Sequence, residues 1–213
     1  MSTNADQPPK MSDMVMDHPI AKDNVMPMGW TSENVARDFG VTREMQDKFA
    51  ELSHHRAEEA QKQGWSADEI VPITTHWKDP KTGEIKQTLV DKDDGIRVGT
   101  TYEALSKVRP AFPQWKPSTT TGGNASQITD GAAAVLLMKR STAEKLGQKI
   151  IGKFVKSTVV GLEPRIMGIG PSLAIPKILA QTGLSKDEID LFEINEAFAS
   201  MVCPCFEDPR RPL

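Results

Sequence analysis

The chain opens on a stretch without hydrophobic periodicity, and helical spacing begins only after it. Residues 1–25 follow a period of neither 2 nor 3.6, so they are expected to form an irregular lead-in. A helix is predicted next, with Thr31 or Ser32 as its N-cap, because a hydroxyl there accepts from the free N–H groups of the first turn. Glu33 then falls in that first turn, and Gly40 is placed to end the helix.

A second and longer helix is predicted directly after the first. Thr42 is its expected N-cap, and Gly64 is placed to end it. Met45, Phe49 and Leu52 are spaced so that they share one face of this helix. The two helices therefore form an amphipathic pair.

Strand-favouring residues follow the helical pair. Residues 70–77 and 85–90 are rich in β-branched and aromatic side chains, and the turn sequence DPKTG at 79–83 separates them. The pattern predicts a β-hairpin.

Apolar strand-like runs alternate with helix signals in the second half of the chain. A capping-box sequence at 141–144 separates the first apolar run from the second. A predicted helix from Pro171 to Gly183 and a capped turn at Ser185 come before the third run. The predicted strands are residues 132–138, 150–160 and 189–194. Strands that alternate with helices of about ten residues predict an α/β fold with mainly parallel pairing.

Composition and charge narrow the classes of function. The net charge is −3 and both signs are spread along the chain, which argues against a nucleic-acid binder and a polybasic membrane adaptor. The apolar runs are far shorter than the roughly 20 residues of a membrane span, so no membrane partner is expected. The two cysteines, Cys203 and Cys205, do not form the framework of a secreted disulfide-rich protein.

Hydroxyl side chains and paired glycines gather in the sequence STTTGGNAS at 118–126. Gly122 and Gly123 let the backbone approach a ligand closely, and Ser126 can supply a hydrogen bond, so the segment can hold a polar cofactor arm. The same composition is typical of a flexible turn into the next element. Composition alone favours the turn.

Three polar side chains close the last predicted strand, in the sequence EINE at 193–196. Asn195 would lie at the carboxyl end of a parallel strand, where active sites of α/β proteins gather, or it would simply cap the following helix. His54, His55 and His76 have no partners at metal-ligand spacing and are interpreted as surface residues.

Five motifs, in this order and spacing, resemble thiolases of the 3-ketoacyl-CoA degradative type. The resemblance runs from about residue 11 to about residue 201. The motifs are MPMGWTSENVA at 26–36, DGIR at 94–97, GNAS at 123–126, MGIGP at 167–171 and NEAFA at 195–199.

The resemblance implies a partial thiolase fold, in which a loop domain is inserted into the first of two βαβαβ core halves. Residues 1–127 would form the loop domain, with 1–25 as the lead-in, and 128–147 the end of the first core half. Residues 148–202 would begin the second core half, and 203–213 form a tail that departs from the family pattern.

The resemblance also implies a set of site residues. Arg97 would face the phosphate or adenine end of CoA, while Gly122, Gly123 and Ser126 would line its pantetheine arm. Met28 and Phe198 would pack against the bound CoA. Asn195 would position a water in the oxyanion hole.

Members of the resembled family cleave 3-ketoacyl-CoA with free CoA, hold no permanent cofactor and form homodimers, and the degradative type implies a peroxisomal location. Their acyl-accepting cysteine and general-base histidine have no counterparts in this sequence, so an internal fragment that is inactive alone is expected. The alternatives are a non-catalytic protein that binds CoA or a thiolase, and a small α/β scaffold whose motifs are only turns.

Overall fold

The computed structural model describes residues 11–129 and 131–202. The whole predicted tail, 203–213 with Cys203 and Cys205, and the first ten residues of the predicted lead-in lie outside the described residues. The described part of the lead-in is not irregular throughout. It contains helix α1 (Asp13–Asp17), which Ser12 caps, and the 3₁₀ turn η1 (Ala21–Val25).

Helix α2 (Met28–Phe39) begins earlier than the sequence predicts. Its N-cap position is Pro27, so the expected cap at Thr31 or Ser32 is wrong and Glu33 lies in the second turn, not the first. The Thr31 hydroxyl instead donates to the Met28 carbonyl over 2.6 Å, within the helix. Gly40 ends the helix at φ 70°, as predicted.

Helix α3 (Arg43–Gln63) confirms the second predicted helix. The Thr42 hydroxyl accepts from the Met45 amide at 3.2 Å, and Gly64 ends the helix at φ 69°. Phe49 and Met45 pack against a small core of Ala36 in α2 and Val41 in the α2–α3 connection. Leu52 is 44% exposed and does not share the buried face.

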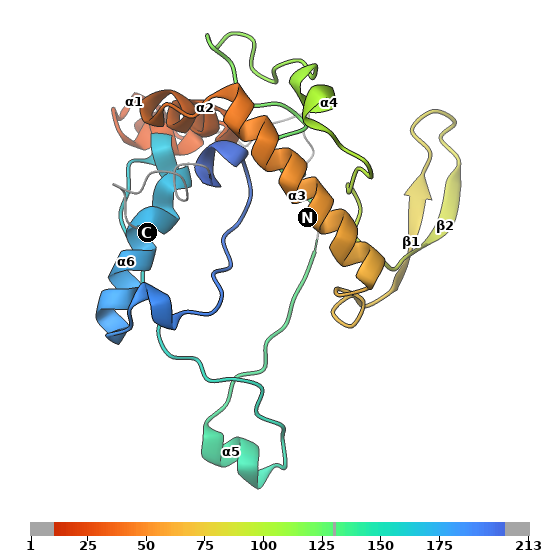
Figure 1. Ribbon diagram of the computed structural model, residues 1–213, viewed down its shortest axis with the longest axis vertical. Helices are drawn as coiled ribbons and strands as arrows, with labels where there is room; N and C mark the ends of the chain where they lie inside the picture. Colours follow the sequence, from red (N-terminus) through yellow and green to blue (C-terminus); the bar gives the residue numbers. More distant parts are fainter. Residues whose placement is uncertain (1–10, 130, 203–213) are drawn as a thin grey trace.

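Strands β1 (Ile73–Lys78) and β2 (Ile85–Val90) form the predicted antiparallel hairpin, with Ile73 opposite Val90. The Asp79 carboxylate accepts from the Lys81 amide at 2.7 Å and shapes the turn. All residues of both strands are exposed. The hairpin projects from the far end of α3 (Figure 1).

Five further helical elements follow the hairpin. Helix α4 (Tyr102–Ser106), which the sequence did not predict, begins after Thr101. The capping box expected at 141–144 does not form, because the helix there begins at residue 140 after Lys139, which makes no cap hydrogen bond. The predicted helix ending at Gly183 and the capping box of Ser185 with Glu188 are confirmed. These later elements are α5 (Arg140–Lys145), η2 (Pro164–Ile169), α6 (Gly170–Thr182) and η3 (Lys186–Glu188).

The parallel strands expected at 132–138, 150–160 and 189–194 are not formed. In the part of the chain that the structure describes, the hairpin is the only sheet. A parallel strand satisfies its backbone groups through neighbouring strands, and no described strand lies beside these three segments. Val135, Leu136 and Ile151 are therefore 81%, 78% and 95% exposed.

The elements that hold the site are α2, α3 and the segments that pack on them. Turn η2 lies against α2, where the Asn34 side chain donates to the Arg165 carbonyl at 3.1 Å and the Arg165 guanidinium binds the Asp38 carboxylate at 2.6 Å. Helix α5 lies apart from the other elements, at the end of two extended segments (Figure 1). The buried interior is unusually polar and includes Ser32, Glu33 and Asp47.

Candidate functional site

Two segments that are distant in sequence meet at the candidate site. Ala125 and Phe198 form an isolated antiparallel bridge. The Ser126 amide donates to the Ala197 carbonyl at 2.9 Å, and the Ala199 amide donates to the Asn124 carbonyl at 3.0 Å. The Gly-rich loop, defined as residues 122–126, is thereby joined to the segment that follows Asn195.

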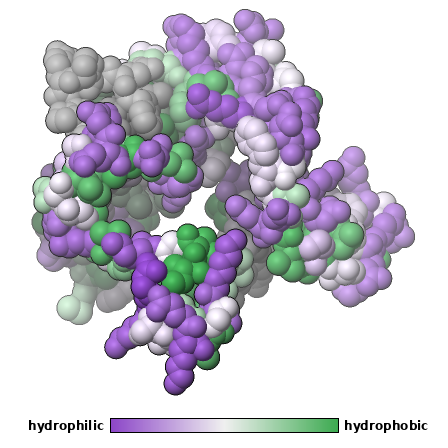
Figure 2. Space-filling model, turned by 60° about the horizontal axis from the view of Figure 1, so that its bottom comes forward, coloured by the Kyte–Doolittle hydropathy of each residue, from purple (hydrophilic) through white to green (hydrophobic). Residues whose placement is uncertain are grey.

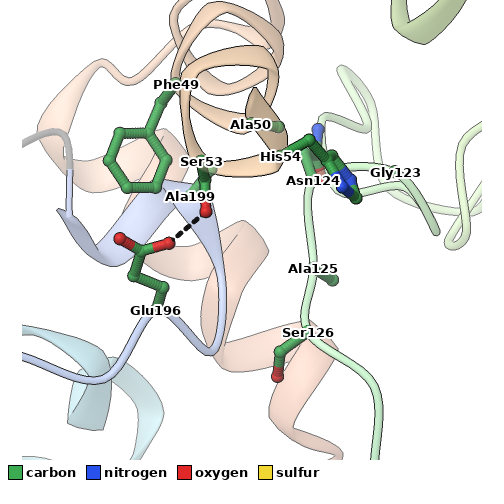
Figure 3. Close-up of a pocket in the computed structure, with 10 residues that line it drawn as sticks. All are labelled: Phe49, Ala50, Ser53, His54, Gly123, Asn124, Ala125, Ser126, Glu196 and Ala199. Atoms are coloured by element: carbon green, nitrogen blue, oxygen red, sulfur yellow. Dashed lines mark hydrogen bonds between the residues drawn. The ribbon is translucent and has the colours of Figure 1, made fainter. Parts of the chain in front are cut away.

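Helix α3 supplies the third wall of a pocket beside this bridge. The Ser53 hydroxyl donates to the Glu196 carboxylate, which ties the helix to the second segment (Figure 3). The pocket has a volume of about 190 Å³, enough for a slender chain of atoms. Its lining residues are Phe49, Ala50, Ser53, His54, Gly123, Asn124, Ala125, Ser126, Glu196 and Ala199.

Asn124 fixes the Gly-rich loop through its side chain. Its amide oxygen accepts from the Thr121 amide at 2.8 Å, and its NH₂ group donates to the Thr119 carbonyl and to the Asp47 carboxylate, each at 3.0 Å. Asp47 is 1% exposed and its other oxygen accepts from Arg43 at 2.6 Å. Because the buried side chains of Asn124 and Asp47 are both hydrogen-bonded, they hold the loop in place against α3.

Ser32 of α2 joins the same loop to the end of the described chain. Its hydroxyl lies 2.8 Å from the Thr120 hydroxyl and 2.7 Å from the Ser200 hydroxyl, and it is fully buried. One side chain therefore connects α2, the residues before the Gly-rich loop and the helical residues that begin at 199.

Side chains of α3 also bind the backbone of the segment that carries Arg97. Glu58 accepts from the Gly99 amide at 3.0 Å, His55 bonds the Thr100 carbonyl at 2.7 Å, and Glu51 accepts from the Tyr102 amide at 2.9 Å. Hydrogen bonds from Lys62 and from the Gly99 amide lower the pKa of Glu58. The segment is thus held along one face of the helix.

The structure brings some of the predicted site residues together. Gly123 and Ser126 line the pocket, and Phe198 pairs with Ala125 at its edge. Gly122 is exposed beside them, with open space around its Cα. Gly123 has a packing reason to be glycine, because a Cβ there would lie 2.6 Å from the Leu105 side chain.

Other predicted residues lie outside the pocket lining. Met28 is the first residue of α2 and is 49% exposed. Asn195 is exposed next to Glu196, and it does not cap the following helix, whose helical residues begin at 199. Arg97 is exposed, but its loop lies close by, since a Cβ on Gly95 would overlap the Gln127 side chain, one residue beyond Ser126.

Sequence reasoning missed several residues of the site. His54 was interpreted as a surface histidine, yet it lines the pocket with Ser53. The spacing from Phe49 through Ser53 carried a signal, because residues four apart share a helix face. Glu33 and Asp47 offered none, since a buried carboxylate is not distinguishable from a solvated one in sequence.

The described residues contain no group of three or more His, Cys, Asp or Glu side chains arranged to hold a metal ion. None of the helices within these residues is both long and apolar enough to span a membrane.

Comparison with known families identifies the chain. Residues 1–141 match the family model described as thiolase, N-terminal domain, and residues 148–210 match the thiolase C-terminal domain. The chain belongs to the thiolase family. This thiolase chain carries part of the α/β thiolase fold, in which the pocket lies between segments of both matched domains.

Named relatives of this thiolase chain include peroxisomal enzymes. It is 53% identical to 3-ketoacyl CoA thiolase 1, peroxisomal, of Petunia hybrida over 87% of this chain and 40% of that protein. It is 49% identical to the human peroxisomal 3-ketoacyl-CoA thiolase over 96% of this chain and 48% of that protein. The chain thus spans less than half the length of these relatives.

Solved thiolase structures superimpose on the chain over a similar range. The dimeric peroxisomal thiolase of Saccharomyces cerevisiae gives a TM-score of 0.78 at 44% identity, covering 94% of this chain and 49% of that one. The human mitochondrial 3-ketoacyl-CoA thiolase gives a TM-score of 0.74 at 38% identity, covering 84% and 43%.

Proposed function

We propose that this chain is the CoA-binding middle portion of a 3-ketoacyl-CoA thiolase. The proposed reaction cleaves the 3-ketoacyl chain with the thiol of free CoA and yields acetyl-CoA and a shortened acyl-CoA. The observation that carries the proposal is the bridge between Ala125 and Phe198, which places the two motif-bearing segments on one narrow pocket. The names of the relatives support a peroxisomal location.

The pantetheine arm of CoA is proposed to lie along the Gly-rich loop. Ser126 offers a hydroxyl at the pocket, Gly122 and Gly123 leave the backbone accessible, and Phe198 with Met28 supplies apolar contact. Arg97 is proposed to bind the phosphate end, because its loop touches Gln127 beyond the arm.

Asn195 is proposed to hold the water of the oxyanion hole. A neutral amide can orient a water or donate toward a developing negative charge without adding charge of its own. Its position beside Glu196, which α3 anchors through Ser53, supports a fixed location for the residue.

The assembly is proposed to follow the family. CoA and acyl-CoA act as substrates and no cofactor is held permanently. A homodimer is proposed for the complete enzyme, in line with the dimeric yeast structure. Residues 1–127 are proposed as loop domain, 128–147 and 148–202 as parts of the two core halves, and 203–213 as a divergent tail.

Calorimetric titration of the purified 213-residue chain with CoA tests the proposal. CoA is expected to bind, and ATP, which lacks the pantetheine arm, is expected to bind more weakly. Ser126→Ala should weaken CoA binding, whereas Ser106→Ala should not, because the Ser106 hydroxyl only donates to the Glu103 carbonyl within α4. The absence of CoA binding to the folded chain would overturn the proposal.

A further inference from the structure

Glu33 is a buried carboxylate in the second turn of α2, and none of the proposed steps uses it. Glu33 is 2% exposed, and its neighbours Ser32 and Asn34 are also buried. A carboxylate withdrawn from water requires hydrogen-bond donors around it to offset the lost hydration.

Those donors all come from residues 118–120, which lie shortly before the Gly-rich loop. One oxygen of Glu33 accepts from the Ser118 hydroxyl at 3.1 Å and the Thr120 amide at 2.9 Å. The other accepts from the Thr119 hydroxyl at 2.9 Å, and the Thr119 amide lies 3.0 Å from both oxygens. Two backbone N–H groups are thus satisfied by a helix side chain in place of a sheet partner.

The contacts continue from these residues into the pocket. The Thr119 carbonyl and the Thr121 amide are the partners of the Asn124 side chain, and the Asn124 carbonyl accepts from the Ala199 amide. Any shift of Thr119 relative to α2 therefore moves the loop that carries Ser126. Ser32 is a second α2 side chain that reaches this segment, through the Thr120 hydroxyl at 2.8 Å.

We propose that Glu33 is a positioning residue for the pantetheine arm of CoA: its carboxylate fixes residues 118–120 on α2 and thereby sets the position of the Gly-rich loop. The inference rests on the proposed function, since it assigns the arm to that loop. The segment that carries Arg97 is bound at Gly99 by Glu58 of α3, and α4 is bound at Leu105 by Arg43 of α3, so neither depends on Glu33. Loss of the Glu33 contacts consequently affects the pantetheine end of the site and leaves the nucleotide end in place.

Substitutions at Glu33 differ in how many donors they leave unsatisfied. Glu33→Ala removes both acceptors and leaves the Thr119 and Thr120 amides without a partner. Glu33→Gln keeps one acceptor for those amides, and its NH₂ group can donate to the Thr119 hydroxyl. Because stranding buried donors is costly, Glu33→Ala is expected to weaken CoA binding by on the order of ten-fold or more, and Glu33→Gln by less.

Titration of the 213-residue chain with two probes tests the inference. The affinity for CoA depends on the whole site. The affinity for adenosine 3′,5′-bisphosphate, which lacks the pantetheine arm, depends on the nucleotide end alone. We expect Glu33→Ala to weaken the binding of CoA and to leave the binding of the bisphosphate unchanged. Glu33→Gln should remain folded and weaken CoA binding by a smaller factor. Glu59→Ala is the matched control, because its exposed carboxylate only accepts from Gln63 on the same helix.

Equal losses for both probes, or no loss for either, would overturn the inference. Hydrogen exchange at the Thr119 and Thr120 amides provides an independent readout, in which Glu33→Gln should accelerate exchange there and not within α3. If the wild-type chain binds no CoA, the proposed function fails, and unchanged exchange in Glu33→Gln would then overturn the positioning role separately.

Discussion

Arg97 belongs to a loop whose backbone lies against the residue that follows the Gly-rich loop. Thr100 donates from its hydroxyl to the Arg97 carbonyl at 2.6 Å, and Gly95 lies against Gln127. The guanidinium itself is exposed and available to a phosphate.

Arg97→Ala should therefore weaken the binding of CoA more than the binding of dephospho-CoA. A guanidinium that binds the 3′-phosphate of CoA has no such partner in dephospho-CoA. The comparison is made by calorimetry with both ligands. Arg109→Ala serves as a control for loss of one positive charge. Equal losses for the two ligands would place Arg97 elsewhere along CoA.

Two substitutions of Asn195 distinguish the effect of adding a negative charge from the effect of removing the side-chain amide. In a chain extended to the length of its relatives, Asn195→Asp should reduce kcat more than Asn195→Ala, because a carboxylate repels a developing oxyanion. The loss of an oxyanion-side donor is typically on the order of 10² in kcat. An active Asn195→Asp enzyme, measured at saturating substrate, would contradict the assignment.

The buried carboxylates show which single residues could not be predicted from the sequence. Gly123 and Ser126 line the pocket. They were expected at a site because of the family resemblance, whereas composition alone favoured a turn. Glu33 and Asp47 were not, because their burial depends on donors 77 or more residues away in the chain, such as Asn124.

Helix α3 organises the site as an element. It presents Arg43, Asp47, Glu51, His55 and Glu58 to the backbone and side chains of the segments beside it. These residues follow each other at helical spacing, so one face of a single rigid element holds both the Arg97 segment and the Gly-rich loop.

The contact of Glu58 with the Gly99 amide is expected to depend on pH. Hydrogen bonds from Lys62 and Gly99 lower the pKa of Glu58 from its ordinary value of 4.5. A lowered pKa in the folded chain means that the contact is fully present above pH 4.5 and is lost as the pH falls through the folded value. The Gly99 amide resonance should therefore titrate below pH 4.5.

Glu58→Gln should abolish that titration of Gly99, and Glu44→Gln should not. Glu44 is a matched control because Lys48 also lowers its pKa, while its carboxylate touches no loop amide. A Gly99 titration that persists in Glu58→Gln would assign the pH dependence to another group.

Elements were predicted well where local chemistry decides them. Thr42, Gly40 and Gly64 marked helix ends correctly, and the turn at Asp79 identified the hairpin. The segments at 132–138, 150–160 and 189–194 were predicted as strands and are not, because a strand also needs partners that a local pattern does not contain.

The described molecule exposes apolar side chains that a closed α/β fold buries. Figure 2, in which the end that carries α5 comes forward, shows apolar residues at that surface. Phe154, Val159 and Leu191 are 69%, 83% and 72% exposed. Purified 1–213 should consequently bind a hydrophobic dye and self-associate. A monomer that unfolds in one sharp transition without dye binding would contradict this expectation.

Thiolytic activity is not expected from residues 1–213 assayed alone. Among the described residues that line the pocket none carries a thiol, which is the acyl acceptor that the proposed reaction needs. Turnover of acetoacetyl-CoA should equal the buffer rate. Turnover clearly above buffer that survives Cys203→Ala and Cys205→Ala would show that another group of this chain performs the chemistry.

The separation of α5 from the other elements means that the pocket does not require an unbroken chain. The described residues of both segments that lead to α5 are extended and exposed, so trypsin should cut there first, for example after Lys149 or Lys153. The two peptides would still be joined by the hydroxyls of Ser32 and Ser200 and by the Ala125–Phe198 bridge. A nicked chain should elute as one particle, so its two parts could be produced as separate peptides and mixed to rebuild the site.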